Sequence, residues 1–215
     1  FYKTSSKENI KLAQYFFEKL YEKGYIYRQT ILQPYCKNCQ KFLPDRYIKG
    51  KCPNCGATDQ YSDSCEVCGR AFQSGEIQEP HCAICGSKPT SKESEHYFFK
   101  LTHFSNDLEK WLVENDNLQP EVKNYVLNWI REGLKDWDIS RDITWGVPIP
   151  LEEAKEKVLY VWFDNHIGYI STTLRYFTEN GIDGKKAWNS SKIYHFIGKD
   201  IVYHHYLFLP AMRLG

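Results

Sequence analysis

Eight cysteines constrain the fold of this chain more than any other feature, because all of them occur in CxxC pairs. Two thiolates that are two residues apart can bind the same tetrahedral zinc ion at about 2.3 Å. Disulfide frameworks have scattered spacings, and a thioredoxin-like redox motif is single and follows a strand. The pattern therefore predicts two four-cysteine zinc sites in a reducing compartment. The pairs are Cys36/Cys39, Cys52/Cys55, Cys65/Cys68 and Cys82/Cys85.

The spacing of the pairs does not decide which of them share an ion. Sequential pairing joins the first pair to the second and the third to the fourth, across spacers of 12 and 13 residues. Nested pairing joins the two inner pairs across nine residues, and the two outer pairs to each other. Closing the longer outer loop costs about 1 kcal/mol more at most, which is small against a zinc affinity of roughly 10 to 16 kcal/mol. Both pairings stay open on the residues alone.

The composition predicts a globular chain with a buried core, since 42% of the 215 residues are hydrophobic and 26% are charged. The formal net charge of +1 excludes nucleic-acid binding by bulk positive charge. The longest apolar runs, Val158–Phe163 and Leu207–Met212, are far shorter than the roughly 20 residues of a membrane-spanning helix. Because no secretion signal and no initiator Met are present, the numbering is expected to start inside a longer protein.

Periodicity divides the chain into helical and cysteine-rich zones. A helix is predicted over residues 5–24, with Ser5 and Glu8 as a capping box and Gly24 as its stop. Residues 35–89 lack periodicity, so metal rather than apolar packing is expected to form their core. A strand is predicted over 96–101, and helices over 105–113 and 120–134.

The last zone predicts an α/β fold. Apolar runs at Val158–Phe163 and Ile193–Ile197 have the length of strands, and each precedes a helical pattern, near 168–179 and up to Met212. This order is that of a βαβ unit in a parallel sheet. Because ligands bind at the carboxyl ends of such strands, residues 164–169 and 198–205 are candidates for a binding site.

Several side chains in these segments could carry chemistry or simply support the fold. Trp162 and Tyr169 are either pocket residues or core aromatics. Asp200 follows Gly198 where an anion or ribose site could lie. Arg141 stands between two acids and suits a carboxylate or phosphate, although a surface ion pair would have the same pattern. His204 and His205 point about 100° apart on a helix, so at most one is expected to function and the other to lie at the surface.

Eight motifs in order resemble the methionyl-tRNA synthetase family over essentially the whole chain. The resemblance implies a Rossmann-like class I catalytic domain, interrupted by a connective peptide of zinc knuckles similar to rubredoxin or a zinc ribbon. The motifs are FLPDR (42–46), GKCPNCG (50–56), CEVCG (65–69), DISRD (138–142), WGVPIP (145–150), YVWFD (160–164), IGY (167–169) and HFIGKD (195–200).

The resemblance also implies a function for each matching position. A family member is a cytoplasmic ligase that activates methionine with ATP and Mg²⁺ and esterifies it to its tRNA. Both ATP signature motifs, HIGH and KMSKS, are absent from this sequence, so the isolated chain is expected to be inactive. Arg141 and Asp200 match catalytic groups of the adenylate site, with Asp200 near the ribose. The residues that match the methionine pocket are Trp162, Tyr169, Ile201 and His205.

The zinc pairing also follows from the resemblance. Relatives with a single zinc keep the four inner cysteines and lose both outer pairs together, which implies nested pairing. The chain departs from the family at Asn165-His166, where Ala-Pro is usual, and at Ser62, where Gly is usual. We expect the Asn165-His166 pair to turn outward and to leave the methionine pocket unchanged. The alternative is that His166 faces the pocket, hydrogen-bonds near the substrate and makes binding depend on its titration.

The implied domain organisation has four parts. Residues 1–34 lead from the catalytic domain into the insertion, 35–90 form the double zinc knuckle, 91–150 form a helical remainder, and 151–215 form the second-half βαβ portion. The alternative is a stand-alone zinc-ribbon module that binds RNA or protein through lysines and arginines around the knuckles. Neither interpretation predicts the oligomeric state.

Overall fold

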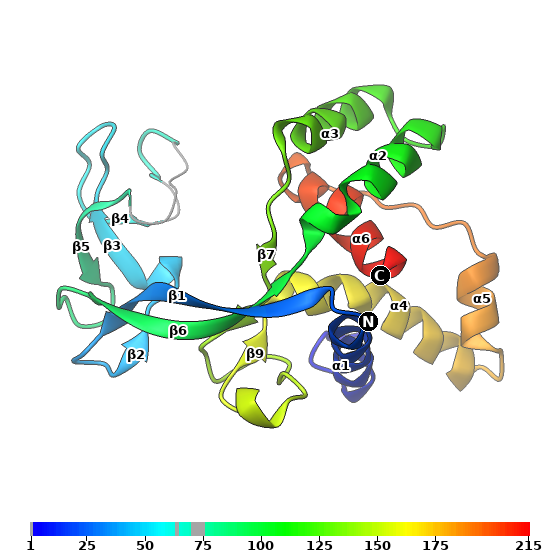
Figure 1. Cartoon of the computed structure of the whole chain (residues 1–215), viewed down its shortest axis with the longest axis horizontal. Coiled ribbons are helices and arrows are strands. Elements are labelled where there is room, and N and C mark those ends of the chain that lie inside the picture. Colours follow the sequence, from blue (N-terminus) through cyan, green and yellow to red (C-terminus); the bar gives the residue numbers. More distant parts are fainter. Residues whose placement is uncertain (1, 63–64, 70–75) are drawn as a thin grey trace. The chain divides into compact units, whose positions relative to one another are not determined.

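The chain folds into two compact units in a computed structural model that describes residues 2–62, 65–69 and 76–215, with only the backbone of Asp200 (Figure 1). Unit 1 comprises Phe1–Gln29 and His96–Gly215, and unit 2 comprises Thr30–Glu95. The fold is mixed α/β. The α-helices among the described residues are α1 (Lys7–Glu22), α2 (Ser105–Glu114), α3 (Pro120–Glu132), α4 (Val161–Glu179), α5 (Gly184–Ser190) and α6 (Leu209–Leu214).

The strands form three small sheets, with orders β2-β1-β6-β7, β4-β3-β5 and β8-β9. In unit 2, β3 pairs antiparallel with both β4 and β5, and Figure 1 shows it between them. In unit 1, β8 pairs antiparallel with β9. The strands are β1 (Ile26–Cys36), β2 (Lys41–Phe42), β3 (Ile48–Lys51), β4 (Gln60–Tyr61), β5 (Gln78–Cys82), β6 (Thr90–Phe99), β7 (Trp137–Asp138), β8 (Ser140–Arg141) and β9 (Val158–Leu159).

The core of unit 1 forms where α1 packs along α4. Phe17 of α1 meets Phe163 of α4 edge to face, with ring centroids 6.4 Å apart. Asn9, 1% exposed, donates a hydrogen bond to the carbonyl oxygen of Asp164 and accepts one from the Ser171 hydroxyl, at 3.3 and 2.8 Å. A buried side-chain amide needs hydrogen-bond partners, so these two bonds fix the position of α1 along the axis of α4.

The predicted first helix is confirmed, but its capping residue is Ser6 instead of Ser5. The Ser6 hydroxyl accepts the backbone N–H of Asn9 at 3.2 Å, so Asn9 takes the position that the capping box assigned to Glu8. Gly24 has a φ of +75°, which confirms it as the residue that ends this helix. The predicted helices at 105–113 and 120–134 are confirmed as α2 and α3. The strand predicted over 96–101 is confirmed in part, because β6 begins at Thr90 and ends at Phe99, two residues before the predicted end.

The prediction of a strand over Val158–Phe163 is wrong for its second half. The strand β9 ends at Leu159, and α4 begins at Val161, seven residues before the predicted helix. Phe163, Ile167 and Ile170 are buried at the i, i+4, i+7 spacing of a helix. Their contacts with the core favour the helix over the local strand propensity of the apolar run.

The strand predicted over Ile193–Ile197 is absent too, so the structure does not contain the predicted βαβ unit. Residues 191–198 are irregular and mostly exposed, and the Phe196 side chain is 97% exposed. A strand requires a hydrogen-bonded neighbour, and this segment has none within the part of the chain that the structure describes. Among those residues, none of the helices is long and apolar enough to cross a membrane.

Candidate functional site

The cysteines gather into two four-thiol clusters in unit 2. The outer cluster contains Cys36, Cys39, Cys82 and Cys85, and the inner cluster contains Cys52, Cys55, Cys65 and Cys68. In each cluster the four Sγ atoms lie within 4.8 Å of one another. The grouping confirms nested pairing and excludes sequential pairing.

The sulfur separations match those of a tetrahedral site. In the outer cluster the Sγ atoms of Cys36 and Cys85 are 3.4 Å apart, and in the inner cluster those of Cys55 and Cys65 are 3.7 Å apart. Four thiolates around one zinc ion at about 2.3 Å have separations of about 3.8 Å, whereas a disulfide bond is about 2.05 Å long. The donor set and its spacing therefore fit zinc.

Backbone turns present the thiols to a common centre. The backbone N–H of Cys55 donates to the Sγ of Cys52 at 3.4 Å, and that of Gly56 donates to the carbonyl oxygen of Cys52 at 3.0 Å. Gly56 has a φ of +75°, which a residue with a side chain rarely adopts. The same turn recurs after Cys82, where Gly86 closes it.

Hydrogen bonds shift the pKa values of two thiols of the outer cluster in opposite directions. The hydroxyl and backbone of Ser87 lower the pKa of Cys85 to about 5. The hydrogen bond with Cys85 is the main cause that raises the pKa of Cys39 to about 12. A cation in the cluster would stabilise the thiolate form of all four sulfur atoms, because metal ligation requires deprotonated cysteine.

A single strand connects the two clusters. Ile48, the first residue of β3, lies opposite Cys82 of the outer cluster, and Cys52 of the inner cluster follows the last residue of β3. The Gly50 position on this strand has no room for a Cβ atom, which would collide with the carbonyl oxygen of Gln78 on β5. Close pairing of β3 with β5 therefore sets the separation of the two clusters.

In unit 1, a series of two hydrogen bonds joins three of the predicted pocket residues, Ile201, His205 and Tyr169. The Nδ1 atom of His205 lies 2.9 Å from the carbonyl oxygen of Ile201, and its Nε2 atom lies 2.9 Å from the hydroxyl of Tyr169. A carbonyl oxygen only accepts, so Nδ1 carries the proton, and in the neutral ring Nε2 accepts from the Tyr169 hydroxyl. The Tyr169 oxygen keeps its lone pairs for a ligand.

His166 is buried beside the hydrogen-bonded Ile201–His205–Tyr169 series, as the alternative for the Asn165-His166 pair predicts. Its side chain is 1% exposed, and its Nδ1 atom donates to the carbonyl oxygen of Trp162 at 2.6 Å. The Nε2 atom is buried with no hydrogen-bond partner in the described structure. Burial lowers the pKa of His166 to about 4, so the ring is neutral at pH 7 and Nε2 is an unsatisfied acceptor. Only Asn165 turns outward, so the expectation for the pair is wrong at His166.

His204 lies between two tryptophan rings, so the prediction that it is a surface side chain is wrong. Its ring stacks on Trp162 at 4.2 Å and on Trp137 at 4.7 Å, measured between centroids. Burial lowers its pKa to about 4. Three segments that are far apart in the sequence, at Trp137, Trp162 and His204, meet in this stack, so no local pattern could have predicted it.

A cavity of about 1170 Å³ borders these groups. Tyr169, His205 and His166 line it, and the irregular segment 191–197 forms another part of its wall. Trp162 and Ile201 do not line it, although both contact the lining histidines. Two of the four predicted pocket residues therefore face the cavity, and the other two support them.

Arg141 belongs to a separate network of charged groups. Its Nη1 atom donates to the carbonyl oxygen of Ser140 at 2.6 Å and lies 3.1 Å from Oδ2 of Asp138. The guanidinium lies over the Tyr160 ring, 3.9 Å from its centroid. Such contacts hold the planar group in one orientation, as expected of an anion-binding arginine. The side chain of Asp200, the other predicted catalytic group, lies outside the described residues.

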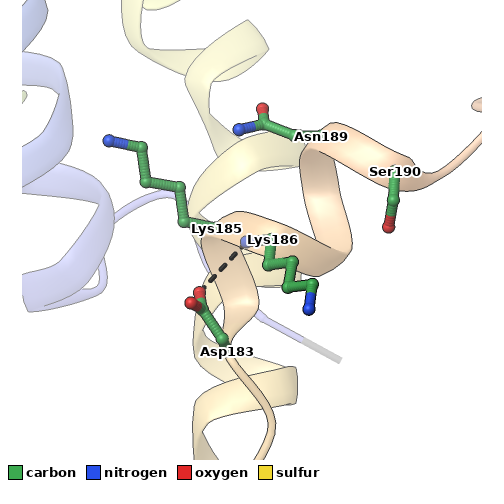
Figure 2. Close-up of a pocket in the computed structure, with 5 residues that line it drawn as sticks. All are labelled: Asp183, Lys185, Lys186, Asn189 and Ser190. Atoms are coloured by element: carbon green, nitrogen blue, oxygen red, sulfur yellow. Dashed lines mark hydrogen bonds between the residues drawn. The ribbon is translucent and has the colours of Figure 1, made fainter.

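A second hollow, of about 470 Å³, lies at the start of α5 (Figure 2). Its Asp183 side chain caps the helix by accepting the backbone N–H of Lys186 at 3.0 Å. Figure 2 shows the side chains of Lys185 and Lys186 extending in different directions. No set of groups converges there, so this hollow is explained by helix capping.

Relatives of this chain include methionine--tRNA ligases. The family model for tRNA synthetases class I (M) matches residues 1–215. The chain is 52% identical over 210 residues to a methionine--tRNA ligase of Methanopyrus kandleri, covering 97% of this chain and 31% of that protein. It is 50% identical over 217 residues to that of Methanocaldococcus jannaschii, covering 100% of this chain and 32% of that protein. The chain thus spans about a third of the length of these relatives.

A solved structure shares the fold. The crystal structure of Mycobacterium tuberculosis methionyl-tRNA synthetase bound by methionyl-adenylate matches with a TM-score of 0.65 at 22% identity. The match covers 100% of this chain and 37% of that chain. It includes unit 1 as well as the cysteine clusters, which the alternative of a stand-alone zinc ribbon does not explain.

Proposed function

The chain belongs to the family of tRNA synthetases class I (M), and from this membership we propose that it is the central part of the catalytic core of a methionine--tRNA ligase. The whole enzyme activates methionine with ATP and Mg²⁺ and transfers it to tRNA in the cytoplasm. The observation that carries the proposal is the Ile201–His205–Tyr169 hydrogen-bonded chain at the large cavity. It presents one oriented hydroxyl in an aromatic surrounding, which suits a thioether side chain.

Each part of the chain has a role in this proposal. Residues 1–34 lead into the insertion, 35–90 form the zinc domain, 91–150 the helical remainder and 151–215 the second half of the nucleotide fold. Tyr169 and His205 contact methionine, and Trp162 and Ile201 shape that pocket. Arg141 and Asp200 act on the adenylate. In support of the role of Arg141, its Nε and Nη2 atoms make no hydrogen bond within the described part of the chain, which leaves one edge of the guanidinium for an anion.

Methionine-dependent ATP–pyrophosphate exchange by the full-length protein tests this function. Tyr169→Phe removes the hydroxyl that His205 holds, and we expect the KM for methionine to rise at least fivefold. Tyr176→Phe is the matched control, because Tyr176 lies on the same helix with 59% of its side chain exposed. Equal effects of the two variants, or no exchange by the wild-type protein, would contradict the proposal.

Arg141→Ala tests the adenylate site separately. We expect kcat to fall by more than tenfold, about 1.4 kcal/mol, because a charge on the reacting phosphate loses its partner. Arg131→Ala is the control, since Arg131 has a largely exposed side chain on α3. The isolated 215-residue chain should show no exchange, because the resemblance assigns ATP binding to motifs that it lacks.

We also propose that each cysteine cluster holds a structural Zn²⁺. All four positions of a tetrahedral ion are filled by sulfur, which leaves none for a substrate. Replacing Cys36 and Cys39 by Ser should remove one zinc per chain, measured by atomic absorption. Cys82 and Cys85 should then react with a thiol reagent, while Cys52 and Cys55 stay protected by the inner ion. Reaction at Cys52 and Cys55 instead would contradict the proposed metal ligation.

A further inference from the structure

Among the residues that the structure describes, His96 is the most deeply buried titratable group that the proposed function does not use. It lies on β6 with a side-chain exposure of 0%. Its Nδ1 atom lies 2.8 Å from Oδ2 of Asp138, and its Nε2 atom lies 2.9 Å from Oδ2 of Asp142. Both partners come from the Asp138–Asp142 segment, which also contains Arg141.

The geometry determines the charge of this ring. An ionised carboxylate only accepts hydrogen bonds, so a histidine that contacts one through each nitrogen must carry a proton on both. A neutral ring would place a lone pair against a carboxylate oxygen at less than 3 Å. Burial acts to lower the pKa of His96, but the hydrogen bonds with Asp138 and Asp142 outweigh it, and the pKa is raised.

The charges around the ring are arranged in alternation. Arg141 pairs with Asp138 on one side of the imidazole, and Lys157 pairs with Asp142 on the other. Three cations therefore alternate with two carboxylates, which compensates each buried charge. Asp138 also accepts the backbone N–H and the hydroxyl of Ser140, at 3.1 and 3.2 Å, so its carboxylate cannot rotate without losing bonds.

We propose that His96 is a positioning residue that, as an imidazolium, bridges both ends of the Asp138–Asp142 segment and thereby fixes the direction of the Arg141 guanidinium. Asp138 transmits the effect, because its Oδ2 atom contacts both the His96 ring and Arg141. Without the bridge, the two carboxylates compete for Arg141 and Lys157, and the guanidinium loses its single orientation. The consequence for catalysis rests on the proposed function, in which Arg141 binds the adenylate.

Histidine-selective ¹⁵N NMR of the full-length protein tests the charge of the ring without any activity. At pH 8 we expect one imidazolium with protons on both nitrogens. The signal should be lost in His96→Gln and kept in His103→Gln, where the replaced histidine is exposed. In Asp142→Asn the same signal should titrate at least one pH unit lower, which identifies it even if His96→Gln does not fold. A neutral ring at pH 8 would overturn the proposal.

Steady-state exchange kinetics then test positioning. His96→Gln should lower kcat at least fivefold and change the KM for methionine less than twofold, whereas His103→Gln should change neither. A charged ring together with an unchanged kcat would overturn the positioning role. A charged ring in a protein that shows no methionine-dependent exchange would contradict the proposed function and leave the bridge itself intact.

Discussion

At the scale of single residues, Asn165 and His166 are neighbours in sequence but lie in opposite surroundings. The helical turn of α4 directs Asn165 to solvent and His166 under the Tyr169–His205 pair, where ring centroids of His166 and His205 are 4.9 Å apart. The resemblance identified this dipeptide as a departure, but an outward direction for both residues assumed an exposed loop. Because the segment is helical, only one of the two can face the core.

Replacing each of these residues alone should therefore give different results. We expect His166→Ala in the full-length protein to weaken methionine binding by more than tenfold, about 1.4 kcal/mol, because it leaves a gap beside His205. Asn165→Ala should change the dissociation constant less than threefold. Isothermal titration calorimetry measures both, and a larger effect of Asn165→Ala would show that the wrong residue had been assigned to the pocket.

Asp164 has a raised pKa, and its effect on the stability of the fold can be measured. It is 7% exposed, and burial raises its pKa to about 7. Because the folded protein holds this proton more tightly than the unfolded chain, the contribution of the protonated carboxyl to stability is complete below about pH 4. It is lost as the pH rises to about 7.

The variant Asp164→Asn stays neutral and escapes this loss. Its melting temperature in the full-length protein should exceed that of the wild type by more at pH 8 than at pH 5.5. Between these two pH values, the difference in the free energy of unfolding between variant and wild type should grow by on the order of 1 to 2 kcal/mol, after allowance for solvent screening. Differential scanning fluorimetry at both pH values measures this difference. If the difference in melting temperature between variant and wild type became smaller as the pH rises, the prediction would be contradicted.

At the scale of elements, β3 has the strictest packing requirement in unit 2. It contacts β4 on one side and β5 on the other, and a register irregularity lies between Lys49 and Lys51. A side chain at Gly50 would meet both the Gln78 carbonyl and the Ile77 side chain. The strand therefore accepts only glycine at this position.

Gly50→Ala should separate β3 from β5 and disturb both cysteine clusters. We expect a cost of about 1 to 3 kcal/mol and faster loss of zinc to a chelator, followed with a chromophoric zinc indicator. Lys51→Ala on the same strand is the control and should lose zinc at the wild-type rate. Equal rates for the two variants would mean that β3 does not couple the clusters.

At the scale of the whole molecule, the two units have cores of different kinds. Unit 1 buries a large apolar cluster, whereas among the described residues of unit 2 the apolar cluster contains five buried residues, two of them the cysteines Cys36 and Cys82. With zinc bound as proposed, unit 2 is stabilised mainly by its metal sites, while unit 1 is stabilised by packing such as that of α1 against α4.

Chelation should accordingly unfold unit 2 alone. After treatment of the full-length protein with a strong zinc chelator, limited proteolysis should cut within residues 30–95 first, as read by mass spectrometry. Fragments ending before and starting after unit 2 should stay associated in native gel filtration, because the contacts of α1 with α4 remain. Cleavage within α4 at the same rate would contradict this independence.

The sequence by itself determined the metal-binding chemistry and the family, because CxxC spacing and ordered motifs are local properties that short segments carry unaided. It also determined α1, α2 and α3, whose periodicity agrees with their burial. Only the tertiary structure decided the start of α4, the irregular course of residues 193–197, the burial of His166 and the stacking of His204 between two tryptophans. These depend on contacts between segments far apart in the chain, which can override local strand propensity and assign an apolar run to a helix. The nested grouping of the thiols was implied by the family resemblance and not by the spacing, because every CxxC pair is locally equivalent. The tertiary structure adds the physical arrangement, in which the pairing of β3 with β5 places Cys82 opposite Ile48.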